Sequence, residues 1–151
     1  MIEEIIKHIR DREYMGGIER KKARVKSTGE VFTPTDVVIE TLNKLPQEYF
    51  SDPEQPFVDP SCGDGQYLGE VLIKKMENGL DFETALSTTF GVDLMQDNVD
   101  LCRERLLCGQ EHLRYIVENN IVCHDGLTYD YNFGKEEPKD ESRPNLLIES
   151  D

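Results

Sequence analysis

Three aspartates in this sequence stand where short apolar runs end, and their carboxylates could bind a polar ligand. Asp59, Asp93 and Asp125 come at or just after runs that are typical of buried strands. A carboxylate accepts two hydrogen bonds from a ribose diol, or one from an exocyclic amine. One such acid alone is as easily a turn residue or a strand-end cap. Three of them, together with a glycine turn after the first, favour a ligand site.

The glycine turn lies in the segment 59–68, Asp-Pro-Ser-Cys-Gly-Asp-Gly-Gln-Tyr-Leu. Gly63 and Gly65 allow a sharp turn and a close approach of the backbone to a ligand, because glycine has no Cβ. No lysine follows the glycines, which excludes a phosphate-binding P-loop. A third glycine is also missing, which argues against a nicotinamide dinucleotide site. The turn suits a ligand with a positive or neutral end, held beside a helix N-terminus.

A second polar turn comes earlier in the chain, at a helix start. Thr33 is a good N-cap, Pro34 suits the first helical position, and Asp36 lies three residues after the cap. The free backbone N–H groups of this helix start would suit a carboxylate. A ligand that matches all these groups is adenosine with an amino-acid tail. Asp93 would take its ribose and Asp125 its adenine amine, and S-adenosylmethionine is such a ligand.

The spacing of apolar residues predicts helices that alternate with strands. The expected helices cover 2–12, 34–45, 66–77, 81–87, 95–107 and 110–118, and the expected strands cover 57–59, 89–93, 121–123 and 145–148. This alternation predicts an α/β fold with a partial, mostly parallel sheet and flanking helices, and ligands bind such sheets at the carboxyl ends of the strands. We expect a polar connector over 46–56 and a mobile loop over 131–143.

The same pattern predicts which side chains form the core and how the chain divides. The expected core consists of Ile5, Ile9, Val38, Leu42, Phe57, Val58, Leu68, Leu72, Phe90, Val92, Val99, Leu106, Ile121, Val122, Leu146 and Ile148. An N-terminal helix and a basic segment are expected over 1–26. A ligand-binding domain is expected over 27–151.

The charge and the cysteines restrict the class of protein. With 17 basic and 31 acidic residues, the net charge is −14, which argues against strong DNA binding by this chain alone. The basic run 20–26 is interpreted as a solvated surface. Four cysteines without a CxxC pair indicate reduced thiols in a cytoplasmic protein, with no metal site expected. No apolar run approaches the ~20 residues of a membrane span, and the acidic start of the sequence is unlike a signal peptide.

Four segments of the sequence resemble the motifs of the adenine-N6 DNA methyltransferases, which include the modification parts of type I and type IIG restriction systems. Gly-Glu-Val-Phe-Thr-Pro (29–34) resembles the N-terminal cofactor motif, and the turn at 59–68 resembles the central motif Asp-Pro-x-Cys-Gly-x-Gly-x-Phe-Leu. Gly-Val-Asp-Leu (91–94) resembles the ribose motif, and Cys-His-Asp-Gly-Leu (123–127) the adenine motif. The segments lie in the family's order. The resemblance implies a Rossmann-like S-adenosylmethionine-dependent methyltransferase fold.

The resemblance also implies roles for particular residues. Thr33 and Pro34 would border the methionine end, Asp93 would bind the ribose, Met95 would cover the adenine ring and Asp125 would bind its amine. Asp59 and the turn at 62–65 would hold the amino-acid moiety. The full set of cofactor-binding residues that the resemblance implies is Phe32, Thr33, Pro34, Asp59, Pro60, Ser61, Cys62, Gly63, Gly65, Tyr67, Asp93, Leu94, Met95, Asp125, Gly126 and Leu127.

One motif of the family is missing from the sequence. The catalytic Asn/Asp-Pro-Pro-Tyr/Phe, which holds a flipped adenine at the end of the fourth strand, is replaced by Leu-Ile-Glu-Ser-Asp at 147–151. We therefore expect no catalytic residue in this chain and interpret it as the cofactor part of a truncated or split methylase. A sheet of about four strands leaves an open edge. Either the loop 131–143 or a second copy of the chain would cover that edge. We expect a homodimer, or a companion methylase or specificity chain, as the partner, with DNA bound weakly or through the partner.

Two other functions stay open at this point. The chain could bind S-adenosylmethionine without transferring its methyl group, as a sensor or regulatory protein, and the acidic composition favours this alternative. It could also be an enzyme that acts on the cofactor itself or on a small substrate. All of these candidate functions require binding of the cofactor, whereas methyl transfer to DNA is expected only of the methylase.

Overall fold

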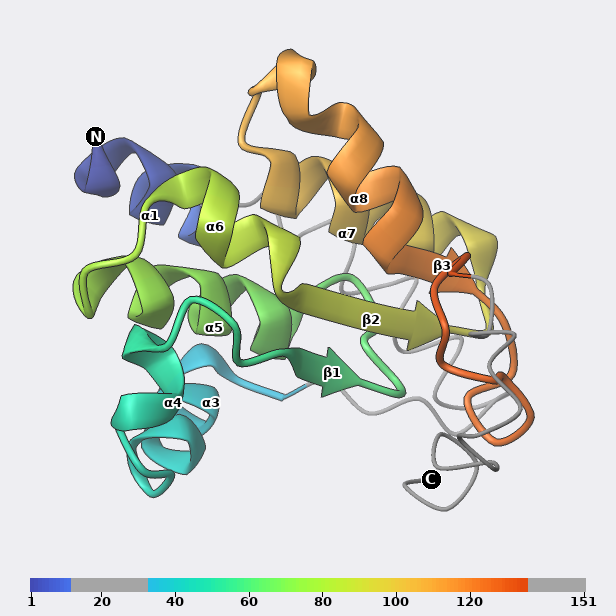
Figure 1. Ribbon diagram of the computed structural model, residues 1–151, viewed down its shortest axis with the longest axis horizontal. Helices are drawn as coiled ribbons and strands as arrows, with labels where there is room; N and C mark the ends of the chain where they lie inside the picture. The colour runs from blue at the N-terminus through green and yellow to red at the C-terminus, as the bar shows by residue number, and fades with distance from the viewer. Residues whose placement is uncertain (12–32, 136–151) are drawn as a thin grey trace, which may run out of the picture.

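A computed structural model describes residues 1–11 and 33–135 and shows an α/β arrangement in which helices alternate with three strands (Figure 1). The elements are α1 (Ile2–Arg10), α3 (Thr35–Asn43), α4 (Glu48–Ser51), β1 (Phe57–Asp59), α5 (Gln66–Glu77), α6 (Phe82–Ser87), β2 (Thr89–Asp93), α7 (Gln96–Leu107), the 3-10 turn η1 (Glu111–Leu113), α8 (Arg114–Asn120) and β3 (Ile121–Cys123). The predicted fold class is confirmed at this level. None of the helices in the described ranges is long and apolar enough to cross a membrane.

The three strands form one parallel sheet in the order β1-β2-β3. Side chains alternate between the two faces of a strand, so the pairing register places Gly91 and Asp93 on one face and Phe90 and Val92 on the other. A Cβ on Gly91 would lie 2.6 Å from the Leu68 side chain of α5. The face that bears Gly91 therefore packs directly on α5, which brings this helix close behind the carboxyl end of β2.

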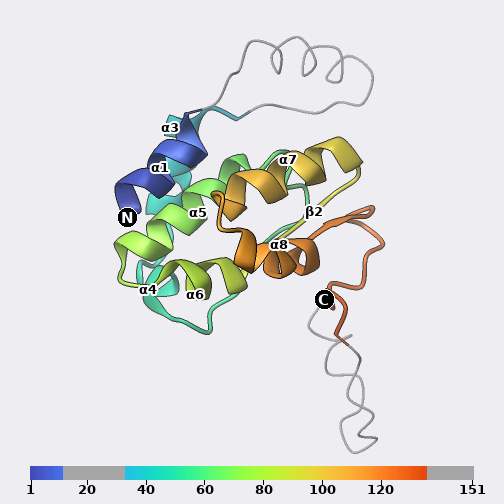
Figure 2. The ribbon, with the colours of Figure 1, turned by 90° about the horizontal axis from the view of Figure 1, so that it is seen from above.

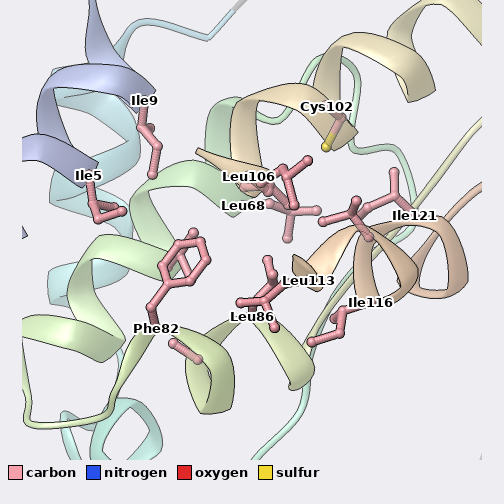
Figure 3. Close-up of a cluster of buried hydrophobic side chains, with 14 of the residues drawn as sticks. Ile5, Ile9, Leu68, Phe82, Leu86, Cys102, Leu106, Leu113, Ile116 and Ile121 are labelled. Carbon is pink, nitrogen blue, oxygen red and sulfur yellow. The ribbon is translucent and has the colours of Figure 1, made fainter. Parts of the chain in front are cut away.

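The core gathers around α5. Figure 3 shows Leu68 of this helix among side chains from α1, α6, α7, α8 and β3. A second, smaller cluster joins α3 and α4 to α5 through Val38, Leu42, Phe50 and Val71. Buried apolar side chains of this size each contribute about 1.5–3 kcal/mol relative to exposure. Because α5 follows the glycine turn directly, the best-packed helix of the protein also carries the turn.

Helix α1 packs against α5 and α7, on the opposite side of the molecule from the segment that follows β3 (Figure 2). Ile5 and Ile9 are buried, which confirms their predicted place in the core. Ile9 fits against Gly69 of α5, where a Cβ would lie 2.6 Å from the isoleucine methyl. Arg10 donates two hydrogen bonds to Glu70, of 2.6 and 3.0 Å. These contacts hold α1 on the helix that carries the turn.

The buried Lys75 of α5 joins the amino ends of β1 and β2. Its Nζ donates to the Thr88 carbonyl at 3.0 Å and to the Thr88 hydroxyl at 2.7 Å, and it lies 3.4 Å from the Gln55 carbonyl. The side chain is fully buried, and burial lowers its pKa to about 8. Neutral oxygens, rather than a carboxylate, therefore surround this ammonium group.

Several predicted boundaries are wrong in detail. Helix α3 begins at Thr35 rather than Pro34, because the extended Pro34 (φ −61°, ψ 150°) is itself the cap and its carbonyl accepts from Val38 N–H at 3.1 Å. Thr33 is therefore not the N-cap. The expected connector 46–56 contains the short helix α4. The expected helix 110–118 begins as the 3-10 turn η1 and continues as α8 to Asn120.

Four predicted core residues are only partly buried. Val58 is 39% exposed, and Phe57, Phe90 and Val122 are half-buried. Val58, Phe90 and Val122 share the sheet face opposite to Gly91. On that face Phe133 packs against Phe90, and their ring centroids are 4.7 Å apart. Parallel strands are normally continuous apolar runs because both faces of the sheet are covered.

The strand 145–148 with Leu146 and Ile148, the basic run 20–26 and Phe32 lie outside the described residues.

Candidate functional site

The turn between β1 and α5 is tied to the neighbouring strand. Cys62 N–H donates to the Val92 carbonyl at 2.9 Å, and Ser61 N–H donates to Asp59 Oδ1 at 3.0 Å. Gly63 and Gly65 have φ of +54° and +96°, which only glycine adopts without strain. Apart from the two residues that flank Gly63 in the chain, no atom of the described residues lies within 4 Å of the place where a Cβ would stand on Gly63. The backbone at Gly63 therefore borders open space, as a ligand-binding turn requires.

Asp93 holds the turn from the end of β2. Its Oδ1 accepts from Gly63 N–H at 3.0 Å, and its Oδ2 accepts from Met95 N–H at 3.0 Å and from Asn98 Nδ2 at 3.1 Å. The residue is 8% exposed. A carboxylate has about four acceptor positions. With three of them used inside the protein, Asp93 keeps one for a ligand hydroxyl, whereas the expected bidentate contact with a ribose diol needs two.

The loop after β3 crosses to the end of β1. His124 N–H donates to the Asp93 carbonyl at 3.0 Å, which extends the ladder beyond the strand, and Leu127 N–H donates to Asp125 Oδ1 at 2.9 Å. A Cβ on Gly126 would lie 2.3 Å from the Pro60 carbonyl oxygen, so a side chain at this position would collide with backbone. The structure thus brings the ends of β1, β2 and β3, with their three acids, to one edge of the sheet.

The charges at this edge are close enough to affect one another. Burial raises the pKa of Asp59, the Ser61 N–H opposes this shift, and the charge of Asp93 adds to it. Tyr131, from the loop after β3, donates its hydroxyl to the Gly126 carbonyl. Burial raises the pKa of Tyr131, and the charges of Asp125 and Asp59 raise it further. The edge therefore favours a ligand that brings a positive group.

Exposed apolar side chains flank the acids. Leu94 is 67% exposed, Leu127 is 95% exposed and Met95 is half-buried. Leu94 follows Asp93 directly, Met95 comes one residue later, and Leu127 follows the glycine after Asp125. Apolar side chains that are solvent-exposed beside a polar site can cover the faces of a flat ring and so recover part of the free energy of burial.

At the other side of the turn, the starts of two helices meet. Gln66, the first residue of α5, donates from Nε2 to Thr35 Oγ1 of α3 at 2.9 Å. Thr33 is half-buried and Pro34 is exposed just before α3. The structure therefore places Thr33 and Pro34, the described end of the N-terminal motif, beside the start of α5.

Sequence reasoning missed four residues that shape the site. They are Asp64, Gln66, Asn98 and Tyr131. Asp64 is buried in the middle of the turn, 3.8 Å from the equally buried Arg105 of α7. Nothing in the sequence distinguishes a buried acid at this position from a solvated one. Asn98 follows Asp93 by five residues, which is the distance from a strand end into the first turn of the next helix, and that spacing could have identified it.

The cysteine of the turn is part of the packing. Cys62 and Cys102 are both buried free thiols, and a hydrogen bond between them together with burial raises the pKa of Cys62 well above its ordinary range. Cys62 therefore stays a neutral thiol under the turn. Over the part of the chain that the structure describes, no three His, Cys, Asp or Glu side chains are grouped to hold a metal ion.

A hollow of about 540 Å³ lies beside β3 and the loop that follows β3. Its lining includes Asn119, Val122, His124, Tyr129 and Phe133. The ring centroids of His124 and Tyr129, which both line the hollow, are 4.7 Å apart. Comparisons of the chain with protein-family models, with curated proteins and with solved structures gave no match.

Proposed function

We propose that this protein binds S-adenosylmethionine at the carboxyl ends of β1, β2 and β3 and forms the cofactor-binding part of an adenine-N6 DNA methyltransferase. The fold would then be the Rossmann-like methyltransferase fold. The observation that carries the proposal is the hydrogen bond from Gly63 N–H to Asp93 Oδ1. It joins the segment that resembles the family's central motif to the segment that resembles its ribose motif. Gly126 of the adenine motif reaches the same turn at Pro60.

The residues present fit this ligand. The open backbone at Gly63 can approach the amino-acid end, and the remaining acceptor position of Asp93 can take one ribose hydroxyl. Asp125 is exposed and its Oδ2 is available to an adenine amine, since Oδ1 is the atom that accepts from Leu127 N–H. Leu94 and Leu127 offer apolar contact to a ring. The acidic edge suits the positive charge of a sulfonium.

The bound cofactor would supply a methyl group on a sulfonium, which an adenine amine can attack in line. This chain's residues would bind and orient that group. The residues that hold the target adenine and receive its proton must come from elsewhere, because the 151 residues contain no Asn-Pro-Pro-Tyr or Asn-Pro-Pro-Phe. The net charge of −14 agrees with a division of labour in which other residues contact DNA.

Calorimetric titration with S-adenosylmethionine tests the proposal. The parent protein should bind, and Asp125→Asn should weaken binding about tenfold, because the substitution keeps the Leu127 contact but removes the acceptor for the amine. Asp130→Asn is the matched control. Asp130 lies on the same loop and also accepts a backbone N–H two residues on, from Asn132 at 3.1 Å. Absence of binding to the parent, or equal loss in both variants, would overturn the proposed site.

A non-catalytic cofactor-binding protein is the second candidate, favoured by the absence of the base-binding motif and by the acidic charge. It would bind S-adenosylmethionine with the same residues and would act on a partner rather than on DNA. A labelled-methyl assay on unmethylated DNA separates the two candidates. The first expects transfer when the complementing residues are supplied by a companion chain, and the second expects none under any combination.

A further inference from the structure

Gln66 has a buried acceptor atom that the protein does not use. The residue is 7% exposed, and its Nε2 donates to Thr35 Oγ1 at 2.9 Å. Its Oε1 is buried and has no hydrogen-bond partner among residues 1–11 and 33–135. An unpaired buried carbonyl is unfavourable, so an atom of this kind marks a place where another group can pair with it. The Gln66 amide therefore has the character of a binding group.

The amide lies where the first turns of two helices meet. Gln66 begins the twelve-residue helix α5, and its partner Thr35 begins the nine-residue helix α3. The first backbone N–H groups of a helix have no carbonyl partner inside the helix and favour a negative group, and in α3 one of them, Val37 N–H, already donates to Asp36 Oδ1 at 3.0 Å. The Gln66 carbonyl, by contrast, needs an N–H donor. A group that carries a carboxylate and an ammonium on adjacent positions satisfies both requirements.

We propose that Gln66 Oε1 accepts a hydrogen bond from the ammonium of an α-amino-acid head, and that this contact selects ligands with such a head over plain nucleosides. The proposal deepens the proposed function and rests on it, because it assigns the ligand's amino-acid end to the place where the starts of α3 and α5 meet. Asp59 supports it from the start of the same turn. Its pKa is raised by burial and by Asp93, and a nearby ammonium would relieve that unfavourable charge.

Three ligands and one near-isosteric variant test the contact. S-adenosylmethionine carries both the ammonium and the carboxylate, decarboxylated S-adenosylmethionine keeps only the ammonium, and 5′-methylthioadenosine has neither. Gln66→Met removes the acceptor at nearly constant volume. It should weaken the first two ligands by the same factor, about tenfold to a hundredfold for a bond to a charged group, and leave the third unchanged. Gln47→Met is the control, since it makes the same exchange at an exposed glutamine outside the turn, whose Nε2 donates to the Leu45 carbonyl at 2.8 Å, and it should change all three affinities less than threefold.

Each other outcome contradicts the assignment in a recognisable way. Loss for S-adenosylmethionine alone would place the carboxylate, rather than the ammonium, at Gln66. Equal loss for all three ligands would show a structural role, and thermal unfolding of the variant would register it. A parent protein that binds 5′-methylthioadenosine as tightly as S-adenosylmethionine would overturn the inference but keep the adenosine site. A parent that binds none of the three would overturn the proposed function itself.

Discussion

The two halves of the candidate site are built differently. At the ends of β1 and β2, the glycine turn is fixed by Asp93, by the Val92 carbonyl and by the packed helix α5 beneath it. At the end of β3, Asp125 and Leu127 are exposed and their loop is held by turn hydrogen bonds and by contact with Pro60. The first half is preformed, whereas the second has few buried contacts to hold its shape. In ligand sites, a preformed half lowers the cost of ordering on binding, while a less buried half can close over the ligand.

The largest difference is expected from alanine at the two acids. Asp93→Ala leaves three donors of the turn and of α7 without their acceptor in a buried setting, so the free energy of unfolding should fall by about 4 kcal/mol. Asp125→Ala removes one exposed turn contact and should cost less than about 1 kcal/mol. Urea unfolding of the two variants measures both values. Similar losses in the two variants would show that the β3 half is as firmly built as the β1–β2 half.

Glycine substitutions compare the two halves at the backbone. Gly126→Ala forces a Cβ against the Pro60 carbonyl and should cost about 2–3 kcal/mol, because the obstacle is backbone and cannot rotate away. Gly63→Ala meets no atom within 4 Å, and only its positive φ opposes the change, at about 1 kcal/mol. Thermal unfolding should therefore rank Gly126→Ala below Gly63→Ala. The reverse order would mean that the crossing from β3 to Pro60 is loose in solution.

The amino ends of the same strands offer a test by pH. Lys75 has a pKa lowered from 10.5 to about 8, so between these values the unfolded chain binds more protons than the folded protein. The contribution of Lys75 to stability should be constant below pH 8 and should increase from pH 8 to pH 10.5. Lys75→Met should lose this dependence when both proteins are unfolded in urea across the range. If the free energy of unfolding of the variant rose with pH as steeply as that of the parent, Lys75 would not be the buried ammonium that joins β1 and β2.

The smallest effect is expected at Asp59. Its contribution to stability falls as pH rises, whereas that of Lys75 increases. The raised pKa means that ionised Asp59 is less favourable in the folded protein than in the unfolded chain. Its contribution is fully present below the ordinary value of 3.8 and is lost as pH rises through the folded pKa. Asp59→Asn should therefore stabilise the protein at pH 7 by a fraction of a kcal/mol and should show no gain near pH 3. A loss of stability at pH 7 would mean that the carboxylate supports the turn as a charge.

Much of the α/β framework followed from the sequence. The three described strands and helices α5 and α6 lie at the expected residues, and Asp81 caps α6 by accepting from Thr84 N–H at 2.8 Å. Local signals were sufficient there, because apolar period and capping act within one or two turns. These signals did not predict α4, because a four-residue helix is too short to show a helical spacing of apolar residues. They also misplaced the start of α3, because the extended ψ of Pro34 makes the proline the cap.

Of the site, the sequence by itself determined which residue types come at the strand ends and in what order. Only the tertiary structure decided how they are used. It engaged three acceptor positions of Asp93, buried Asp64 beside Arg105 and left one oxygen of Gln66 without a partner. The physical reason is that a carboxylate or an amide has the same sequence signature whether it meets water, a backbone N–H or a ligand. Some partners are local, as Met95 and Asn98 are for Asp93, but the Gly63 N–H that Asp93 binds and the Thr35 hydroxyl that Gln66 binds lie thirty or more positions away and become neighbours only when the chain folds.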